Sequence, residues 1–156
     1  MLTPEPVTTV LNPEVKSELQ IHVSTTAAAA AVAGAVQEAT RLQIHISVAV
    51  VDASGLPVAF LRMHRSPLHS ISIAEDKAYT AASFGVATDA WSDLLKAHSR
   101  AVRAYIPHRP RFTAFGGGLP LCEQGVVIGG VGVSGGTESE DEQCAQAGIK
   151  SAGFQN

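Results

Sequence analysis

Two histidines between a predicted strand and a predicted helix are the side chains best suited to proton transfer. His64 and His69 lie in the stretch His-Arg-Ser-Pro-Leu-His. An unperturbed imidazole titrates near neutral pH, so either residue is a candidate general acid or base and also a candidate ligand for a haem iron. The alternative is that both are loop histidines with neither role. The six histidines show no HExxH or other paired spacing, so we predict no zinc site or other metal-ion site built by side chains alone.

Two basic side chains are candidates for holding a carboxylate. Lys77 lies within a predicted helix among alanines that form a packed face, and Arg62 lies near the end of a predicted strand. If both converge on one pocket, Arg62 can bind a carboxylate through two parallel hydrogen bonds while Lys77 adds a point charge. The alternative is an ordinary ion pair of Lys77 with Asp76 or Asp52.

Two glycine-rich segments are the candidate ligand-binding loops. The first contains Gly116, Gly117 and Gly118, which are costly to order unless the backbone bends tightly or passes close to a ligand. The second contains Ser134, Gly135, Gly136 and Thr137, at the end of a predicted strand and the start of a predicted helix. The N–H groups of such a helix start favour anions, although the segment also serves simply as a helix cap. No GxGxxG or Walker motif is present, so no nucleotide cofactor is predicted.

The elements that would position these residues alternate between strand and helix patterns. Alternating or β-branched runs predict strands, and apolar residues at helical spacing between caps predict helices. Strands are predicted at 18–23, 44–51, 56–63, around 119–121 and at 126–133, and helices at 25–41, 72–84, 89–104 and 137–150. The order is therefore β-α-β-β-α-α-β-β-α. Short turns link the middle and last strand pairs, so we expect an α/β (α+β) fold with a largely antiparallel five-stranded sheet and helices packed against it.

Local turn and cap residues set several of these boundaries. Ser72 to Glu75 and Thr137 to Glu140 both fit the capping box of a helix start. Gly85 is placed to end a helix in the left-handed conformation, and Ser24 or Thr25 to begin one.

Composition limits the class of protein. A chain of 156 residues with 46% hydrophobic and 16% charged residues suits one globular domain, with an irregular arm at 1–17 and a tail at 151–156. The net charge of −3 argues against nucleic-acid binding. One basic cluster is interpreted as a solvated face or a subunit contact; it consists of Arg100, Arg103, His108, Arg109 and Arg111.

The apolar run at 27–36 is too short to cross a membrane and is not preceded by a positive region. We therefore expect a cytoplasmic protein with reduced cysteines.

Several motifs, taken in order, resemble the GlcG/HbpS-like family, which includes the C-terminal domain of PduO-type proteins. The resemblance covers about residues 18–150. It rests on Val48–Gly55, Phe60–Met63, Ser72–Ala81, Phe84-Gly85, Gly116–Leu121 and Gly129–Thr137, with Asp141 and Cys144 beyond. The chain departs from the common pattern at His64-Arg65-Ser66, where family members often have Asp-Gly-Ala, and in the basic stretch Ala97–Arg111.

The resemblance implies a profilin-like fold, homo-oligomers, a place in small-molecule catabolism and, for some members, bound haem. Two functions follow as hypotheses. The first is a binding or accessory protein whose pocket holds haem or another flat carboxylated molecule. The second is a cofactor-independent enzyme, of the tautomerase, hydrolase or decarboxylase type. In it Arg62 and Lys77 fix the carboxylate of a small catabolic intermediate, and His64 or His69 moves a proton.

Overall fold

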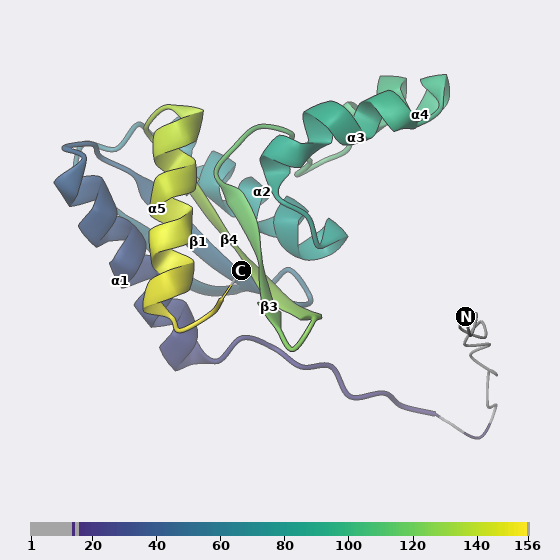
Figure 1. The fold of residues 1–156 in the computed structure, drawn as a ribbon, viewed down its shortest axis with the longest axis horizontal. Helices are drawn as coiled ribbons and strands as arrows, with labels where there is room; N and C mark the ends of the chain where they lie inside the picture. Colours follow the sequence, from purple (N-terminus) through teal and green to yellow (C-terminus); the bar gives the residue numbers. More distant parts are fainter. Residues whose placement is uncertain (1–13, 15, 156) are drawn as a thin grey trace, which may run out of the picture.

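An antiparallel sheet of four strands organises the chain, and the computed structural model describes residue 14 and residues 16–155 of it. The strands are β1 (Ser47–Asp52), β2 (Pro57–Arg62), β3 (Gly118–Glu123) and β4 (Val126–Ser134). Their spatial order is β2-β1-β4-β3, so the two hairpins lie side by side and β1 pairs with β4 in the middle (Figure 1). Ser47 is opposite Arg62 on one side and Ser134 on the other. These three residues therefore lie at the same end of the sheet.

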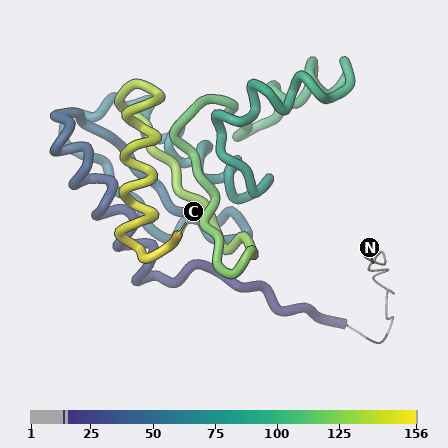
Figure 2. The backbone as a smooth tube through the Cα atoms, viewed as in Figure 1, coloured from purple at the N-terminus to yellow at the C-terminus, as the bar shows by residue number. Residues whose placement is uncertain are grey.

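Helices cover both faces of this sheet. On one face α1 (Thr25–Arg41) and α5 (Glu138–Ser151) lie side by side over a core that includes Val48, Val50, Val131 and Val133 (Figures 1 and 2). On the other face α2 (His69–Phe84) packs on β1 and β4 through alanines. Gly132 of β4 makes this packing very close, because a Cβ there would overlap the carbonyl oxygen of Ala74. The α+β class with an antiparallel sheet is thus as predicted.

The connection between α2 and β3 forms an arm that projects from the body (Figure 1). It consists of the short 3-10 helices Thr88–Ala90 and Ile106–His108 and, between them, α3 (Trp91–Ala97) and α4 (Arg100–Tyr105). The single helix predicted at 89–104 is wrong, because His98 is extended and Ser99 then caps a new helix by accepting a hydrogen bond from the Val102 N–H (3.3 Å).

The fifth strand predicted at 18–23 is absent. Residues 16–24 have no regular secondary structure, and a single backbone hydrogen bond, from the Val23 N–H to the Ile128 carbonyl (2.8 Å), joins this stretch to β4. Asp52, the last residue of β1, is opposite Gly129, so Ile128 lies just beyond β1 and its carbonyl is left for Val23. The alternating pattern expresses strand propensity, but Leu19 and Ile21 are exposed and have no strand to pair with.

Helix boundaries agree with the caps in part. α1 begins after Ser24, whose Oγ accepts a hydrogen bond from the Ala27 N–H, and α2 ends at Gly85 with a φ of 67°. However, α2 begins at His69 rather than at the predicted Ser72 box, and Ser72 Oγ donates to the His69 carbonyl inside the helix. The predicted arm at 1–17 lies largely outside the described residues. No helix within residues 16–155 is long and apolar enough to cross a membrane.

Candidate functional site

Lys77 lies at the centre of a buried cluster and has no exposed surface. Its Nζ donates to Asp141 Oδ2 and to the Val133 carbonyl, each at 2.8 Å, and lies 4.7 Å from the centre of the Phe115 ring. The ion pair therefore ties α2 to β4 and α5. The predicted alternative partners, Asp76 and Asp52, are wrong, since the carboxylate that pairs with Lys77 belongs to Asp141.

The first glycine segment crosses directly over this ion pair. Gly117 has a φ of 114°, and a Cβ there would lie 2.8 Å from both Lys77 Nζ and Asp141 Cβ. The Gly116 N–H donates to Glu138 Oε1 at 3.1 Å, and the Gly118 N–H donates to Thr88 Oγ1 at 2.9 Å. The backbone thus approaches other groups closely, but these groups belong to the chain itself, whereas the sequence had suggested a ligand or a tight bend.

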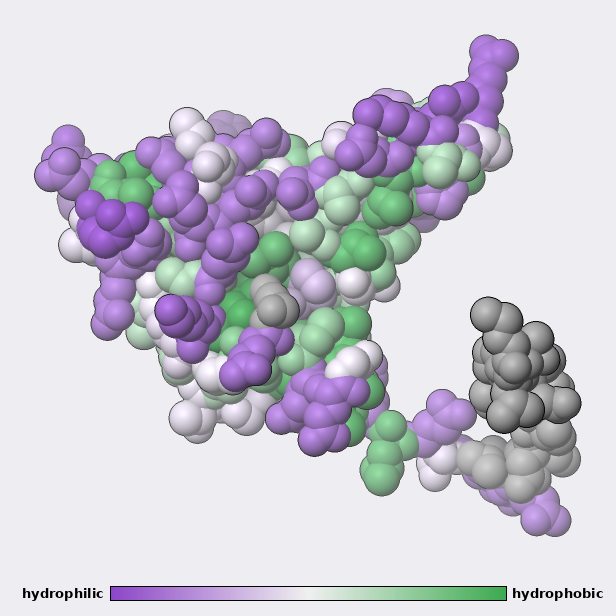
Figure 3. All heavy atoms as spheres, in the orientation of Figure 1, coloured by the Kyte–Doolittle hydropathy of each residue, from purple (hydrophilic) through white to green (hydrophobic). Residues whose placement is uncertain are grey.

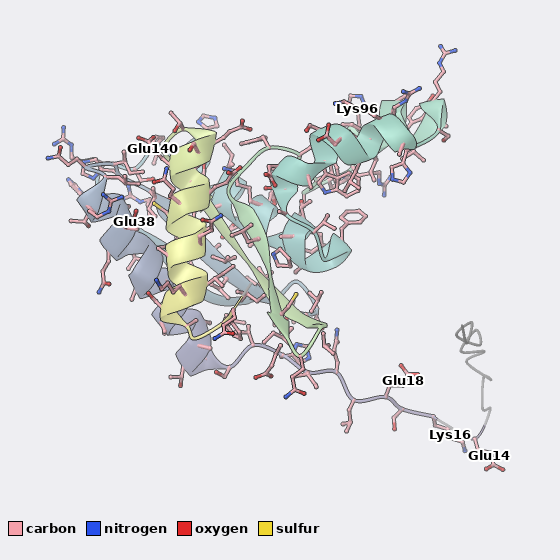
Figure 4. The ribbon with its side chains drawn as sticks, viewed as in Figure 1. Glu14, Lys16, Glu18, Glu38, Lys96 and Glu140 are labelled. Carbon is pink, nitrogen blue, oxygen red and sulfur yellow. The ribbon has the colours of Figure 1, made fainter. Side chains whose placement is uncertain are left out.

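The second glycine segment binds anions that the chain provides. The Gly136 N–H donates to Asp141 Oδ1 at 2.9 Å and the Thr137 N–H to Glu140 Oε2 at 2.8 Å. Thr137 Oγ1 accepts from the Glu140 N–H, which completes the predicted capping box at the first turn of α5 (Figure 4). Ser134 is buried at the end of β4, and Gly135 lies against the His45 backbone.

Burial governs the electrostatics of this cluster. Removal from water lowers the pKa of Lys77, and the Asp141 carboxylate opposes that shift. Burial likewise raises the pKa of Asp141 against the opposing effect of Lys77. The pKa of Glu142 is raised by burial and then by Asp89 and Glu138. Lys77 and Asp141 thus form an ion pair without net charge, next to the acidic side chain of Glu142. Lys77 does not reach the surface in this conformation.

A separate group of predicted residues gathers at the β2–α2 connection. Ser66 is buried there and its Oγ lies 3.1 Å from the Ser47 Oγ, while the Met63 N–H donates to the Ile46 carbonyl. Around this anchored turn Arg62, His64 and His69 are exposed, together with Arg65. Within residues 16–155, neither imidazole has a hydrogen-bonding partner or a carboxylate within salt-bridge distance. Arg62 and the two histidines thus belong to one short, exposed connection, whereas Lys77 and the glycine segments form the other, mostly buried group.

A pocket of about 450 Å³ lies between α2 and the returning part of the arm, and no site residue had been predicted there. Its lining comes from one side of α2 and from the 106–112 stretch, and consists of Tyr79, Thr80, Ser83, Phe84, Ile106, Arg109, Pro110, Arg111 and Phe112. The basic cluster at 100–111 was the sequence signal for this region. It did not reveal the pocket, because the pocket depends on where the arm turns back.

A family described as "Haem degrading protein HbpS-like" matches residues 23–150. The chain belongs to this family. Among curated proteins, an uncharacterized 15.0 kDa protein from the dhaT-dhaS intergenic region of Citrobacter freundii is 37% identical over 132 residues, which cover 83% of this chain and 92% of that protein. The resemblance seen in the sequence motifs is confirmed.

A longer relative and two solved structures are also similar to this chain. Corrinoid adenosyltransferase PduO of Salmonella typhimurium is 35% identical over 115 residues, 74% of this chain, but the chain matches only 34% of the length of PduO. A crystal structure of a PduOC:heme complex has a TM-score of 0.76 and 31% identity, covering 84% of this chain and 95% of that one. A double mutant of Streptomyces reticuli HbpS has a TM-score of 0.75 and 31% identity, covering 96% and 97%.

Proposed function

We propose that the protein binds haem, or another flat molecule with carboxylates, at the β2–α2 connection. One observation carries the proposal: a short connection with an anchored turn carries two exposed imidazoles without a hydrogen-bonding or salt-bridge partner among residues 16–155 and two exposed guanidinium groups. His64 and His69 supply the imidazoles, and Arg62 and Arg65 the guanidinium groups. Arg65 has a φ of 73°, an unfavourable conformation for a residue with a side chain, and such strain is retained more often at functional sites than elsewhere.

The side chains at this surface fit the chemical needs of haem. A histidine nitrogen is a common axial ligand of haem iron, and arginine binds carboxylates such as the propionates through two hydrogen bonds. Apolar surface for the macrocycle is also present, since Phe60 is 41% exposed and Leu68 is 76% exposed. Haem would supply a redox-active iron, and the chain would bind and orient it. The surface is open in one chain, so we propose that a second copy closes the site.

A relative of known ligand supports the assignment. The PduOC structure, which shares the fold at 31% identity, is a complex with haem. In this chain the histidine replacing the common family pattern, His64, lies at the proposed site.

Absorbance titration with haemin tests the proposal. Wild-type protein is compared with His64→Ala, His69→Ala, the double variant and Arg62→Gln, with His108→Ala as the control because His108 is exposed on the arm. We expect a saturable Soret shift that one histidine substitution abolishes, about tenfold weaker binding in Arg62→Gln, and no change in the control. An unchanged shift in the double variant, or the lack of any saturable shift, would contradict the proposal.

A further inference from the structure

We propose that the pocket between α2 and residues 106–112 binds a small, flat, apolar molecule with a carboxylate, at a site separate from the haem surface. The pocket volume of about 450 Å³ falls within the range of small-molecule sites. Its walls hold no histidine and no cysteine, so the ligand is held by stacking and charge rather than by a metal bond.

Apolar side chains from two elements line the pocket. α2 contributes Tyr79 and Phe84, and the 106–112 stretch contributes Ile106, Pro110 and Phe112. The rings of Phe84 and Phe112 are in edge-to-face contact, with their centres 6.0 Å apart, where the two elements meet. Phe84 keeps 47% of its surface exposed although it lies inside an aromatic cluster. In the space-filling view, hydrophobic residues gather where the arm leaves the body (Figure 3). A flat apolar ligand would cover this surface.

Hydrogen bonds and ring contacts hold the two walls in place. Thr80 is buried in α2, and its Oγ1 donates to the Arg111 carbonyl at 2.9 Å and accepts from the Thr113 N–H at 3.0 Å. Trp91 makes edge-to-face contacts with Phe84 and Phe112, with ring centres 4.8 and 4.9 Å apart. The pocket is therefore built before any ligand arrives, which reduces the cost of ordering it.

The charge at the pocket selects an anion. The Arg111 guanidinium lies 3.9 Å from the centre of the Tyr79 ring, and its Nε donates to Asp76 Oδ1 at 3.0 Å. Arg111 is thus fixed and partly neutralised. Arg109 also lines the pocket, and among residues 16–155 no carboxylate lies within salt-bridge distance of it. Its guanidinium is available to a ligand carboxylate.

Trp91 gives the pocket a built-in reporter. It is 4% exposed, and its Nε1 is the one buried side-chain nitrogen or oxygen in the described part of the chain that lacks a hydrogen-bonding partner. It contacts two lining rings, and it is the single tryptophan of the sequence. Its indole N–H signal in a nitrogen-15 correlation spectrum is therefore unique and sits directly behind the wall.

The test uses 2-naphthoate as the probe and its uncharged amide, 2-naphthamide, for comparison. Binding is measured by calorimetry on the full chain, and the Trp91 indole signal locates it. Arg109→Gln removes the free cation, and Arg103→Gln, exposed on α4 and outside the pocket lining, is its matched control. Ser83→Phe fills the pocket from an exposed position of α2, and Ser72→Phe, exposed on α2 outside the pocket, is its control.

We expect naphthoate to bind saturably and to shift the indole signal, with about tenfold weaker binding for the amide and for Arg109→Gln. Ser83→Phe should abolish binding, whereas both controls should bind as the wild type does. Arg109→Gln should leave haemin binding unchanged, which separates this site from the proposed haem surface. The proposal fails if naphthoate does not bind saturably, or if Ser83→Phe and Arg109→Gln bind it as the wild type does.

Discussion

At the scale of single residues, Lys77 and Asp141 form a fully enclosed contact that unites three elements. A buried ion pair adds little net stability over an apolar pair, because desolvation offsets the attraction, but removing one member leaves an uncompensated charge. The pair is therefore best understood as a constraint on how α2, β4 and α5 fit together.

Lys77→Met should lower the free energy of unfolding by about 3–5 kcal/mol, because it leaves the Asp141 carboxylate buried without its cation. In Lys77→Met/Asp141→Leu the loss should be smaller than the sum of the two single losses. Urea denaturation of the four proteins gives the coupling directly. A Lys77→Met variant within about 1 kcal/mol of the wild type would show that Asp141 finds water or another donor.

The two cysteines should differ in reactivity. Burial, followed by the nearby Asp141 carboxylate, raises the pKa of Cys144 to about 12, so almost no thiolate forms at pH 8. Cys122 is only partly buried. We expect iodoacetamide to modify Cys122 first, as read by peptide mass spectrometry, with urea-unfolded protein as the control in which both react. Equal native rates at both positions would mean that α5 opens readily.

At the scale of elements, the capping box of α5 links helix stability to pH. Hydrogen bonds from the Thr137 backbone and then its side chain lower the pKa of Glu140 below its ordinary value of 4.5. A carboxyl group with a lowered pKa contributes stability above the unfolded pKa and loses it as the pH falls through the folded pKa. Glu140 therefore supports the helix start at neutral pH and stops doing so at a pH below 4.5.

Thr137→Ala should cost about 1 kcal/mol at pH 7, because the Glu140 N–H and the Glu140 carboxylate both lose the Thr137 hydroxyl. The difference from wild type should shrink as the pH falls below 4.5, since the wild type then loses the carboxylate bond too. Thermal unfolding at several pH values measures this, with Ser139→Ala as the first-turn control. A difference that is constant from pH 7 to pH 3 would exclude the Glu140 contribution.

The sequence predicted elements well where local chemistry decides them. The hairpin at Asp52–Gly55, the stop at Gly85 and the box at Thr137 all depend on residues next to one another. The strand at 18–23 failed because a strand needs a free partner, and propensity does not report one. The start of α2 was placed a turn late because no side chain caps it, and the preceding turn is fixed instead by the contact of Ser66 with Ser47.

At the scale of the whole molecule, the predicted site residues belong to two separate groups in the structure. From the sequence, Arg62 and Lys77 were expected to share one pocket. Lys77 and Arg62 both have the chemistry to bind a carboxylate, and both lie on the side of the sheet that α2 covers. However, the carboxylate that pairs with Lys77 belongs to Asp141, which is far away in the sequence. Sequence patterns identified which residues carry charge and which backbone segments approach other groups closely. They did not show which carboxylate would pair with Lys77, because that depends on how α5 packs.

The projecting arm is built from helices that need a contact to stabilise them. Helices α3 and α4 are seven and six residues long, too short to be stable alone in water. Residues 91–111 hold five Lys and Arg side chains against Asp93, a net charge of +4, and the whole chain carries −3, so the rest carries −7. Figure 4 places Lys96 on this arm and Glu140 on the first turn of α5. In a homo-oligomer we expect the basic arm of one copy to dock on the acidic first turn of α5 of a second copy, because their charges are opposite.

Light scattering after size exclusion should then give a mass that is a multiple of 16.2 kDa at 0.15 M salt. Because charge guides the docking, the mass should fall at 1 M salt, where the Debye length is about 3 Å. Arg100→Glu/Arg103→Glu should give a monomer at low salt, and Lys150→Glu, exposed at the far end of α5, should not. The raised pKa of Glu142 reflects burial and crowding by Asp89 and Glu138, which basic side chains from a second copy would relieve. A monomeric wild type would contradict this arrangement, and an oligomer unaffected by the arginine substitutions would move the interface to another surface.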